Sequence, residues 1–332
     1  MIGRRTVLAG IAGTLASPRP LAAQTPPRDG MRRLGVLMAN RASDSVAEAY
    51  ISALTKGLHA LDWREGGNLR IDWRWTGGEP ALFDRYAAEL LALGPDVLLA
   101  QASPSVVALK RQTSTIPIVF TMVSDPEGQG FVESLAHPGG NVTGFSDFNP
   151  LISGKWLEIL TQMTPPVARV AVLYNPATAP YAGVMMRAIE DAAPSFAVAV
   201  RAAPCRDDAE IEAMIAGLAQ EGRGGLLVLT DIFNIVHRDV ILRSAALHRM
   251  PTIYFTRSFT SVGGLMSYGI DYADLFLRSA AYIDRALKGT SPRDLPVQQP
   301  TKFELVINLK TAKARDIIIA TTLLATADEV IE

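Results

Sequence analysis

The chain has 332 residues, of which 48% are hydrophobic and 20% are charged, and its formal net charge is -1. This length predicts two domains or lobes. The charge balance leaves no basic excess to neutralise phosphates, which argues against a nucleic-acid-binding protein. The single cysteine, Cys205, excludes an internal disulfide.

The segment from Met1 to Gln24 differs in character from everything that follows. Arg4 and Arg5 precede an apolar run of only ten residues, 7–16, whereas a bilayer span needs about 20. Small residues then lead to Gln24. This pattern predicts a signal peptide over residues 1–24, with export to the periplasm by the twin-arginine or the Sec route. A disordered cytoplasmic tail is the alternative, and a lipoprotein is excluded because the only cysteine is Cys205, far from the end of the leader.

After a linker over residues 25–30, apolar runs of strand length alternate with segments of helical spacing. Helix starts are predicted at Ser43, which would cap the first helix, at Ser103-Pro104 and at Asp125-Pro126. The other elements predicted in the first half are strands at 33–39, 69–75, 96–101 and 116–120 and helices at 44–61 and 81–93.

The same alternation resumes at residue 168. The strands predicted there are 168–174, 196–202, 225–230, 251–255 and 263–269, and the helices are 178–193, 207–219, 235–248 and 271–287. Strand–helix alternation predicts an α/β fold with parallel sheets covered by helices on both faces. Two such series, divided near residues 145–150, predict two similar doubly wound lobes.

Ligands of open α/β sheets bind beyond the carboxyl ends of the strands. The candidate ligand-binding residues are therefore those that follow the predicted strands. They are Asn40, Gln101, Ser103, Ser124, Asp125, Asn175, Asp231, Phe233 and Tyr268. Hydrogen-bonding groups with a few charges and aromatic rings suit the reversible binding of a small polar molecule.

Charged ends of a ligand have candidate partners in this set. The helix start after Ser103 could hold a carboxylate with its free N–H groups, and Asp125 and Asp231 could face an ammonium group. Together they would select a zwitterion such as an amino acid. Ordinary helix capping is the alternative for Ser103 and Asp125. Arg257 either clamps a carboxylate or lies in a surface ion pair, and we favour the ion pair.

Signatures of catalysis are missing from the sequence. It contains no Gly-x-Ser-x-Gly, no Walker loop and no Gly-x-Gly-x-x-Gly after the first strand. The four histidines lie far apart, without the spacing of metal ligands. We therefore predict no catalytic residue, no metal and no cofactor. A cleft enzyme that used Asp125 and Asp231 would be the alternative.

Five stretches resemble one known family. They are "IPIVF", "DPEGQGFVESLAHPGGNVTG", "GGLMSYG", "DLPVQQPTKFELVINLKTAKA" and "LLATADEVIE". In this order, from about Arg33 to Glu332, they are similar to the periplasmic substrate-binding proteins of ABC transporters, whose relatives include tryptophan- and aromatic-amino-acid-binding proteins. The segment "RDIIIATTLL" departs from the family pattern, which affects only the C-terminal packing.

The resemblance implies a type I periplasmic binding fold, with two lobes joined at a hinge. The first lobe would comprise residues 31–146 and 268–300, and the second would comprise 147–267 and 301–332. A monomer would close on a small molecule, with an aromatic or branched-chain amino acid as the leading ligand. The partner would be an ABC permease in the inner membrane. A sensing module for a receptor or kinase has the same fold and remains the alternative function.

Overall fold

The computed structural model describes residues 30–149 and 152–332. The predicted signal peptide, residues 1–24, and the predicted linker up to residue 29 lie outside the described residues. Residues 31–332 form one compact unit by their contacts. The division of this unit into two lobes at the predicted boundaries stays a prediction.

A five-stranded parallel sheet forms from the first half of the chain. Its order is β2 (Leu69–Trp75), β1 (Arg32–Met38), β3 (Val97–Gln101), β4 (Ile118–Val123) and β5 (Val142–Ser146). The strands β3, β4 and β5 are buried throughout, as expected where helices cover both faces of a parallel sheet.

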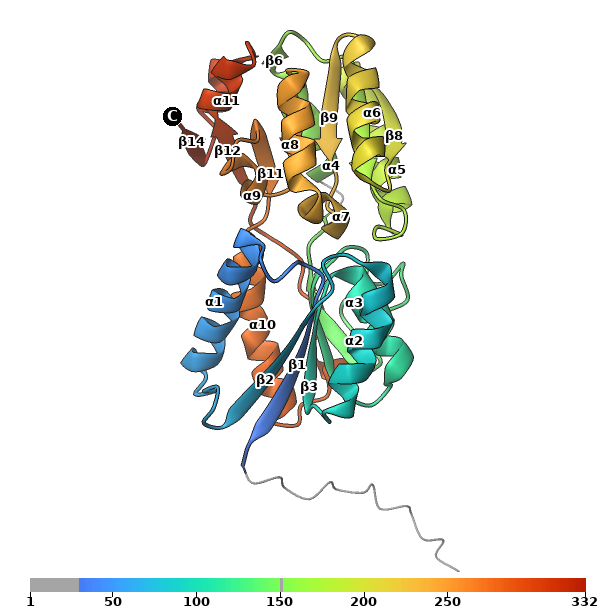
Figure 1. Ribbon diagram of the computed structural model, residues 1–332, viewed down its shortest axis with the longest axis vertical. Coiled ribbons are helices and arrows are strands. Elements are labelled where there is room, and N and C mark those ends of the chain that lie inside the picture. Colours follow the sequence, from blue (N-terminus) through green and yellow to red (C-terminus); the bar gives the residue numbers. More distant parts are fainter. Residues whose placement is uncertain (1–29, 150–151) are drawn as a thin grey trace, which may run out of the picture. The chain divides into compact units, whose positions relative to one another are not determined.

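Helices from distant parts of the sequence cover this first sheet. Figure 1 shows α1 (Ser45–Ala60) and α10 (Tyr272–Leu287) together on one side and α2 (Pro80–Ala92) and α3 (Ala102–Gln112) on the other. The contact between α1 and α10 is tight, since a Cβ on Gly57 would lie 2.6 Å from the carbonyl oxygen of Leu277. Apolar faces at helical spacing produce this packing.

The second sheet has seven strands. Its order is β14 (Glu329–Ile331), β12 (Glu304–Asn308), β11 (Met266–Gly269), β10 (Thr252–Tyr254), β9 (Gly224–Val228), β7 (Arg169–Tyr174) and β8 (Ala199–Pro204). All pairings are parallel except that of β11 with β12, which is antiparallel. The α/β class with parallel sheets is therefore confirmed, with this one departure.

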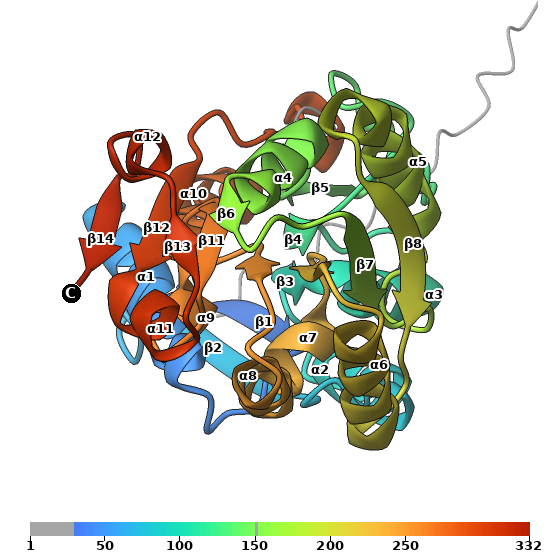
Figure 2. The same ribbon diagram turned by 90° about the horizontal axis from the view of Figure 1, so that it is seen from above.

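Helices lie on both faces of the second sheet. Figure 2 shows α4 (Ile152–Thr161) and α5 (Ala182–Ala192) on one face and α6 (Asp208–Gln220) and α8 (Arg238–Leu247) on the opposite one. The remaining short elements are β6 (Met163–Thr164), which pairs with β13 (Ile318–Ile319), η1 (Ala193–Phe196), α7 (Ile232–Val236), α9 (Arg257–Thr260), η2 (Pro292–Asp294), α11 (Leu309–Ala314) and α12 (Thr321–Leu324).

The chain passes between the two sheets three times. It does so between β5 and α4, between β11 and α10, and between Gln298 and β12. Gln298 still belongs to the first sheet, because it forms a bridge with Phe145 at the edge strand β5. Loop and element-terminal residues that connect two halves of a protein are where a hinge rotation takes place.

Several predicted element boundaries are wrong. The N-cap of α1 is Asp44 rather than Ser43. The predicted helix 235–248 is two helices, α7 and α8, which meet at His237. No short helix follows Asp125: residues 126–130 form a turn, and Gly130 within it has a φ of +67° that a helix does not allow. Helix α4 was not predicted, because its segment follows directly on the expected boundary.

Candidate functional site

One groove is lined by loops at the carboxyl ends of both sheets. The first sheet contributes the loops after β1 and β2, and the second contributes those after β7 and β8 together with α7. The groove has a volume of about 600 Å³, within the range of small-molecule sites. Its lining residues are Arg41, Ala42, Trp75, Thr76, Gly77, Gly78, Glu79, Pro80, Asn175, Ala177, Thr178, Arg206, Phe233, Val236 and His237.

The two sides of the groove touch at Gly78. This residue has a φ of +77°, and a Cβ added to it would lie 3.3 Å from Cγ2 of Val236. Glycine is needed here both for the left-handed backbone and for the close approach to α7. The loop after β2 therefore rests on the helix that follows β9.

Three predicted residues gather on the second-sheet side. Asn175 and Phe233 line the groove, and Asp231 lies directly behind them as the N-cap of α7, with 2% of its surface exposed. Its carboxylate accepts hydrogen bonds from the backbone N–H of Asn175 (2.7 Å), from Oγ1 of Thr178 (2.6 Å) and from the backbone N–H of Phe233 (3.0 Å). Asp231 thus holds the lining loop and α7 in place.

Asn40 and Gln101 form a buried amide pair on the first-sheet side. Gln101 Nε2 donates to the side-chain oxygen of Asn40, and Gln101 Oε1 accepts from the backbone N–H of Ala39 at 3.0 Å. Gln101 Nε2 also lies 3.2 Å from the sulfur of Met122. The pair therefore ties together the ends of β1, β3 and β4.

Ser103 lies beside this pair and lines a smaller cavity of about 160 Å³ that Pro80 and Thr178 also line. Helix α3 begins at Ala102, with Gln101 at the N-cap, so the predicted start, with Ser103 as the cap and Pro104 as the first helical residue, is two residues late. The hydroxyl of Ser103 accepts a hydrogen bond from Nε2 of Gln129 at 3.0 Å.

Asp125 and Tyr268 are not brought to the groove. Oδ1 of Asp125 accepts from the N–H of Gly128 at 3.0 Å, and the residue lines a separate cavity of about 180 Å³. Tyr268 lies on β11, where its ring stacks with Phe303 at 5.9 Å between centroids. Arg257 forms the expected surface ion pair, 2.7 Å from Glu329.

The backbone is strained at the carboxyl end of the first sheet. Ala102, Met122 and Asp125 have φ values of +66°, +58° and +48°, in a region that non-glycine residues rarely adopt. Such strain costs of order 1–3 kcal/mol per residue and clusters at ligand sites. Ala102 directly follows β3, Met122 is the last but one residue of β4, and Asp125 comes two residues after β4, at the edge where the sheet topology places a ligand.

Asp147, which the sequence reasoning missed, is a buried acidic residue in this region with Ser124 as its one side-chain donor. It follows β5, is 5% exposed, and accepts a hydrogen bond from Oγ of Ser124 at 2.6 Å. Burial raises the pKa of Asp147 to about 6, against the opposing effect of Ser124. Within residues 30–149 and 152–332, no ion pair neutralises this carboxylate.

Two buried tyrosines lie near Asp147. Tyr181 precedes α5 and donates from its hydroxyl to the carbonyl oxygen of Thr230 at 2.8 Å. Tyr272 begins α10 and packs edge-on against Phe255 at 5.9 Å. Burial is the main cause that raises the pKa of both phenols, and the charge of Asp147 adds to it. We call Ser124, Asp147, Tyr181 and Tyr272 the Asp147 cluster.

The Asp147 cluster is linked to the groove through Asp231. The carboxylate of Asp231 also raises the pKa of Tyr181, and its hydrogen-bond partner Thr178 lines the groove. The pKa of Tyr181 is therefore raised by a carboxylate that follows the second sheet and by one that follows the first. The sequence contains little signal for Asp147, because β5 before it reads VTGFS and is not an apolar run like the strand that precedes Asp231.

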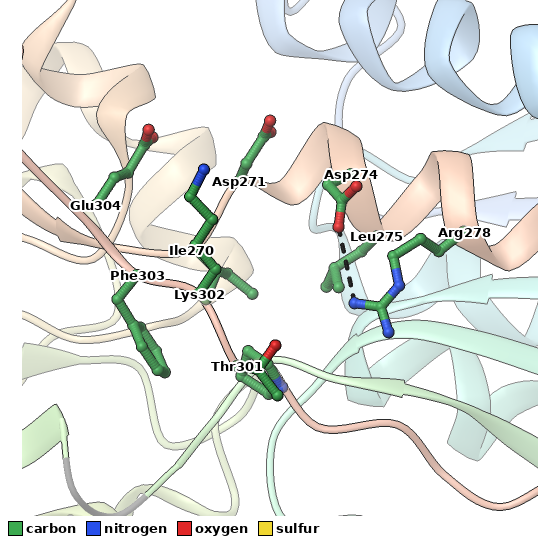
Figure 3. Close-up of a pocket in the computed structure, with 10 residues that line it drawn as sticks. Ile270, Asp271, Asp274, Leu275, Arg278, Thr301, Lys302, Phe303 and Glu304 are labelled. Carbon is green, nitrogen blue, oxygen red and sulfur yellow. Dashed lines mark ion pairs between the residues drawn. The ribbon is translucent and has the colours of Figure 1, made fainter. Parts of the chain in front are cut away.

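A further pocket of about 240 Å³ lies between the start of α10 and the segment 300–304 that leads into β12. Figure 3 shows Asp274 and Arg278 pointing toward each other, 3.7 Å apart, while Lys302 extends between Glu304 and Asp271. Arg278 also covers the ring of Phe145 at 5.2 Å. Acidic and basic side chains both line this pocket, and none of the predicted ligand-binding residues lines it.

Two other kinds of site were searched for in the described part of the chain. No group of three or more His, Cys, Asp or Glu side chains there could hold a metal ion. No helix of the described residues is both long and apolar enough to traverse a lipid bilayer.

Comparison with known proteins identifies relatives over most of the chain. A family model described as "ABC transporter substrate binding protein" matches residues 41–331. A "tyrosine-binding protein" of Clostridioides difficile (strain R20291) is 29% identical over 262 residues, which cover 79% of this chain and 74% of the relative.

Two solved structures agree closely with this fold. A conserved domain protein from Vibrio cholerae is 29% identical, with a TM-score of 0.83 over 90% of this chain and 99% of that one. An ABC domain from Streptococcus pneumonia in complex with L-Trp is 25% identical, also with a TM-score of 0.83, over 91% of this chain and 100% of that one. The fold is thus that of type I periplasmic binding proteins with two lobes.

Proposed function

Because this chain belongs to the ABC transporter substrate-binding protein family, we propose that it binds an aromatic α-amino acid between its two sheets. The family membership makes it a substrate-binding protein of the ABC transporter type. The amino-acid ligand, its delivery to an ABC permease for import, the location in the periplasm and the monomeric state are the finer parts of the proposal. In this role the chain catalyses no reaction.

The observation that carries the proposal is the buried carboxylate of Asp147. A buried charge without a partner is costly, and its pKa of about 6 means that Asp147 is mostly ionised at neutral pH. The described residues provide Ser124 as a donor but no cation within ion-pair distance. An ammonium group of the ligand would supply the missing positive charge, and its attraction to the carboxylate would offset the cost of taking the ammonium group out of water.

The aromatic character of the ligand follows from the rings around this carboxylate. Tyr181 and Tyr272 are buried beside it, and buried aromatic rings favour the stacked or edge-on packing of another aromatic ring. The relatives support the same ligand class, since one is named a tyrosine-binding protein and another was solved with L-Trp.

Domain closure couples this binding to transport. The groove is lined from both sheets, and three connections join the halves. A ligand that contacts both sides stabilises the closed form, because only there are both sets of contacts made. The permease would then recognise the closed form.

The proposal is tested by isothermal titration of the purified protein with L-tyrosine and L-tryptophan. We expect binding of at least one of them, and at least 100-fold weaker binding of 3-(4-hydroxyphenyl)propionate, which lacks the ammonium group. The variant Asp147→Asn should lose about 100-fold in amino-acid affinity, equivalent to about 2.7 kcal/mol. Asp62→Asn, whose side chain is 95% exposed, serves as the matched control and should bind like the wild type.

The affinity should also depend on pH with a defined sign. Protonation of Asp147 removes its attraction for an ammonium group, so affinity falls as the pH drops below about 6, by up to about tenfold per pH unit. Binding of the amino acids that is unchanged between pH 7 and pH 5, or unchanged in Asp147→Asn, would contradict the proposal. So would a protein that binds neither amino acid.

A further inference from the structure

A small cavity beside the groove is lined by both halves of the molecule. Its volume is about 160 Å³, and it shares Pro80, Ala177 and Thr178 with the lining of the groove. Helices α2 and α3 line it from the first half, and the segment after β7 lines it from the second. Its apolar lining residues include Phe83, Pro104, Val107, Ala108, Ala177 and Pro180. A group that enters this cavity therefore contacts both halves.

The polar groups that line this cavity are already paired within the protein. The hydroxyls of Ser103 and Thr178 each take part in a hydrogen bond with another side chain. Asp84 and Arg111 form an ion pair with each other at 3.1 Å. The described residues of the lining thus leave no unpaired charge for a charged end of a ligand, and an apolar group is the occupant that suits them.

The size of the cavity suits an aromatic ring. An engineered apolar cavity of about 150 Å³ in another protein stays dry and binds benzene, and the cavity here has about 160 Å³. Phe83, which is 5% exposed, forms part of the wall. A ring that packs against Phe83 would make the stacked or edge-on contact that aromatic pairs favour.

A short chain of hydrogen bonds connects the cavity to Asp147. Nε2 of Gln129 donates to Oγ of Ser103 at 3.0 Å and also to the carbonyl oxygen of Ser124. Oγ of Ser124 in turn donates to Oδ1 of Asp147 at 2.6 Å. From the second half, Pro180 lines the cavity and directly precedes a tyrosine of the Asp147 cluster. One glutamine and one serine therefore link the cavity to the carboxylate that the proposed function assigns to the ammonium group.

We propose that this cavity holds the aromatic side chain of the amino acid whose ammonium group pairs with Asp147. This inference rests on the proposed function and adds the residues that select the side chain. Val107 and Ala108 form the wall on α3, so their size determines which ring fits. Contacts of the ring with both halves would also stabilise the closed form.

The competing explanation is that the cavity is only a gap in the packing between the halves. A substitution in its lining would then act through closure alone and would change the affinity for every ligand by the same factor. If the cavity holds the side chain, the same substitution changes the affinity by a factor that increases with the size of the ring.

The experiment changes the room in the cavity at Val107, which is half-buried on α3. Isothermal titration compares L-tryptophan, L-tyrosine and L-phenylalanine. In Val107→Phe we expect the affinity for L-tryptophan to fall about 30-fold and that for L-phenylalanine about threefold, since small changes of size in an apolar pocket discriminate by roughly 10–200-fold. Val262→Phe, the same substitution at a position that is 53% exposed, is the matched control and should bind like the wild type.

Val107→Ala supplies a second test that adds no bulk to the protein. It enlarges the cavity, so the affinity for L-tryptophan relative to L-phenylalanine should rise about fivefold. Thermal unfolding without ligand checks that both variants are folded.

Equal changes for the three amino acids in both folded variants, or no change in either, would overturn the inference and leave the proposed function intact. So would a loss in Val107→Phe that is larger for L-phenylalanine than for L-tryptophan. A wild-type protein that binds neither L-tyrosine nor L-tryptophan would instead overturn the proposed function, and this inference with it.

Discussion

Asp147 and Asp231 are both aspartates that follow a strand, both are nearly inaccessible to solvent, and burial raises the pKa of each to about 6. Their surroundings differ. Asp231 accepts three hydrogen bonds from its own half of the molecule, whereas Asp147 accepts one side-chain bond, from Ser124. The number of donors therefore separates a carboxylate that builds the fold from one that is available to a ligand.

The largest effect on stability is expected at Asp231. Asp231→Ala leaves the hydroxyl of Thr178 and the N–H groups of Asn175 and Phe233 without their acceptor. Each unsatisfied buried group costs about 1–3 kcal/mol, so we expect a loss of at least about 3 kcal/mol in the free energy of unfolding. Urea denaturation measures it, with Glu212→Ala, at an exposed position within α6, as the control within about 0.5 kcal/mol. A loss below about 1 kcal/mol, the lower bound for one such group, would show that these bonds do not set Asp231 apart.

The pH dependence of stability should change most clearly in Asp147→Asn. The folded-state pKa of Asp147 lies above its unfolded value, so its contribution is fully present below about pH 4 and is lost as the pH rises through about 6. Relative to the wild type, the unliganded variant should therefore gain stability between pH 4 and pH 7. The gain is at most roughly 3 kcal/mol, since one pKa unit corresponds to about 1.4 kcal/mol.

Denaturation curves at pH 4, 5, 6 and 7 test this difference. The Asn side chain still accepts the bond from Ser124, so a variant less stable than the wild type at pH 7 would mean that Asp147 supports the fold as Asp231 does. The comparison between the two aspartates would then fail.

A smaller effect is expected where the two sides of the groove meet. Gly78→Ala places a methyl group 3.3 Å from Val236, a contact that exists only while the loop rests on α7. L-tyrosine affinity should fall about fivefold, or about 1 kcal/mol. The double variant Gly78→Ala/Val236→Ala should recover most of the loss, whereas the backbone strain caused by the positive φ at this position would persist in both. If the double variant recovers no L-tyrosine affinity, the loss in Gly78→Ala is caused by backbone strain alone.

The strands were largely predictable from the sequence, because a strand buried on both faces must be a short apolar run. β3 and β7 agree with their predicted ranges to within one residue. Asp231 and Asn175, both named as candidates from the ends of their strands, lie beside each other, because neighbouring parallel strands bring their ends together. Their role in ligand binding stays a prediction.

The deciding features of the site depend on tertiary packing. Asp147 is unusual only because Ser124 is its one side-chain donor and because buried tyrosines surround it, and neither property is visible in "GFSDFNP". Asp125, by contrast, was predicted to contact a ligand from its position after a strand. Its carboxylate instead accepts a hydrogen bond from Gly128 within its own turn.

The late return of α10 to the first sheet constrains how the polypeptide is made. Helix α1 packs against α10, yet α1 ends at Ala60 and α10 starts only at Tyr272. During synthesis the apolar face of α1 must therefore wait until most of the chain has left the ribosome. A fragment that stops after β5 would expose this face, so the amino-terminal half is expected to aggregate or be degraded when expressed by itself, while the whole polypeptide folds as one.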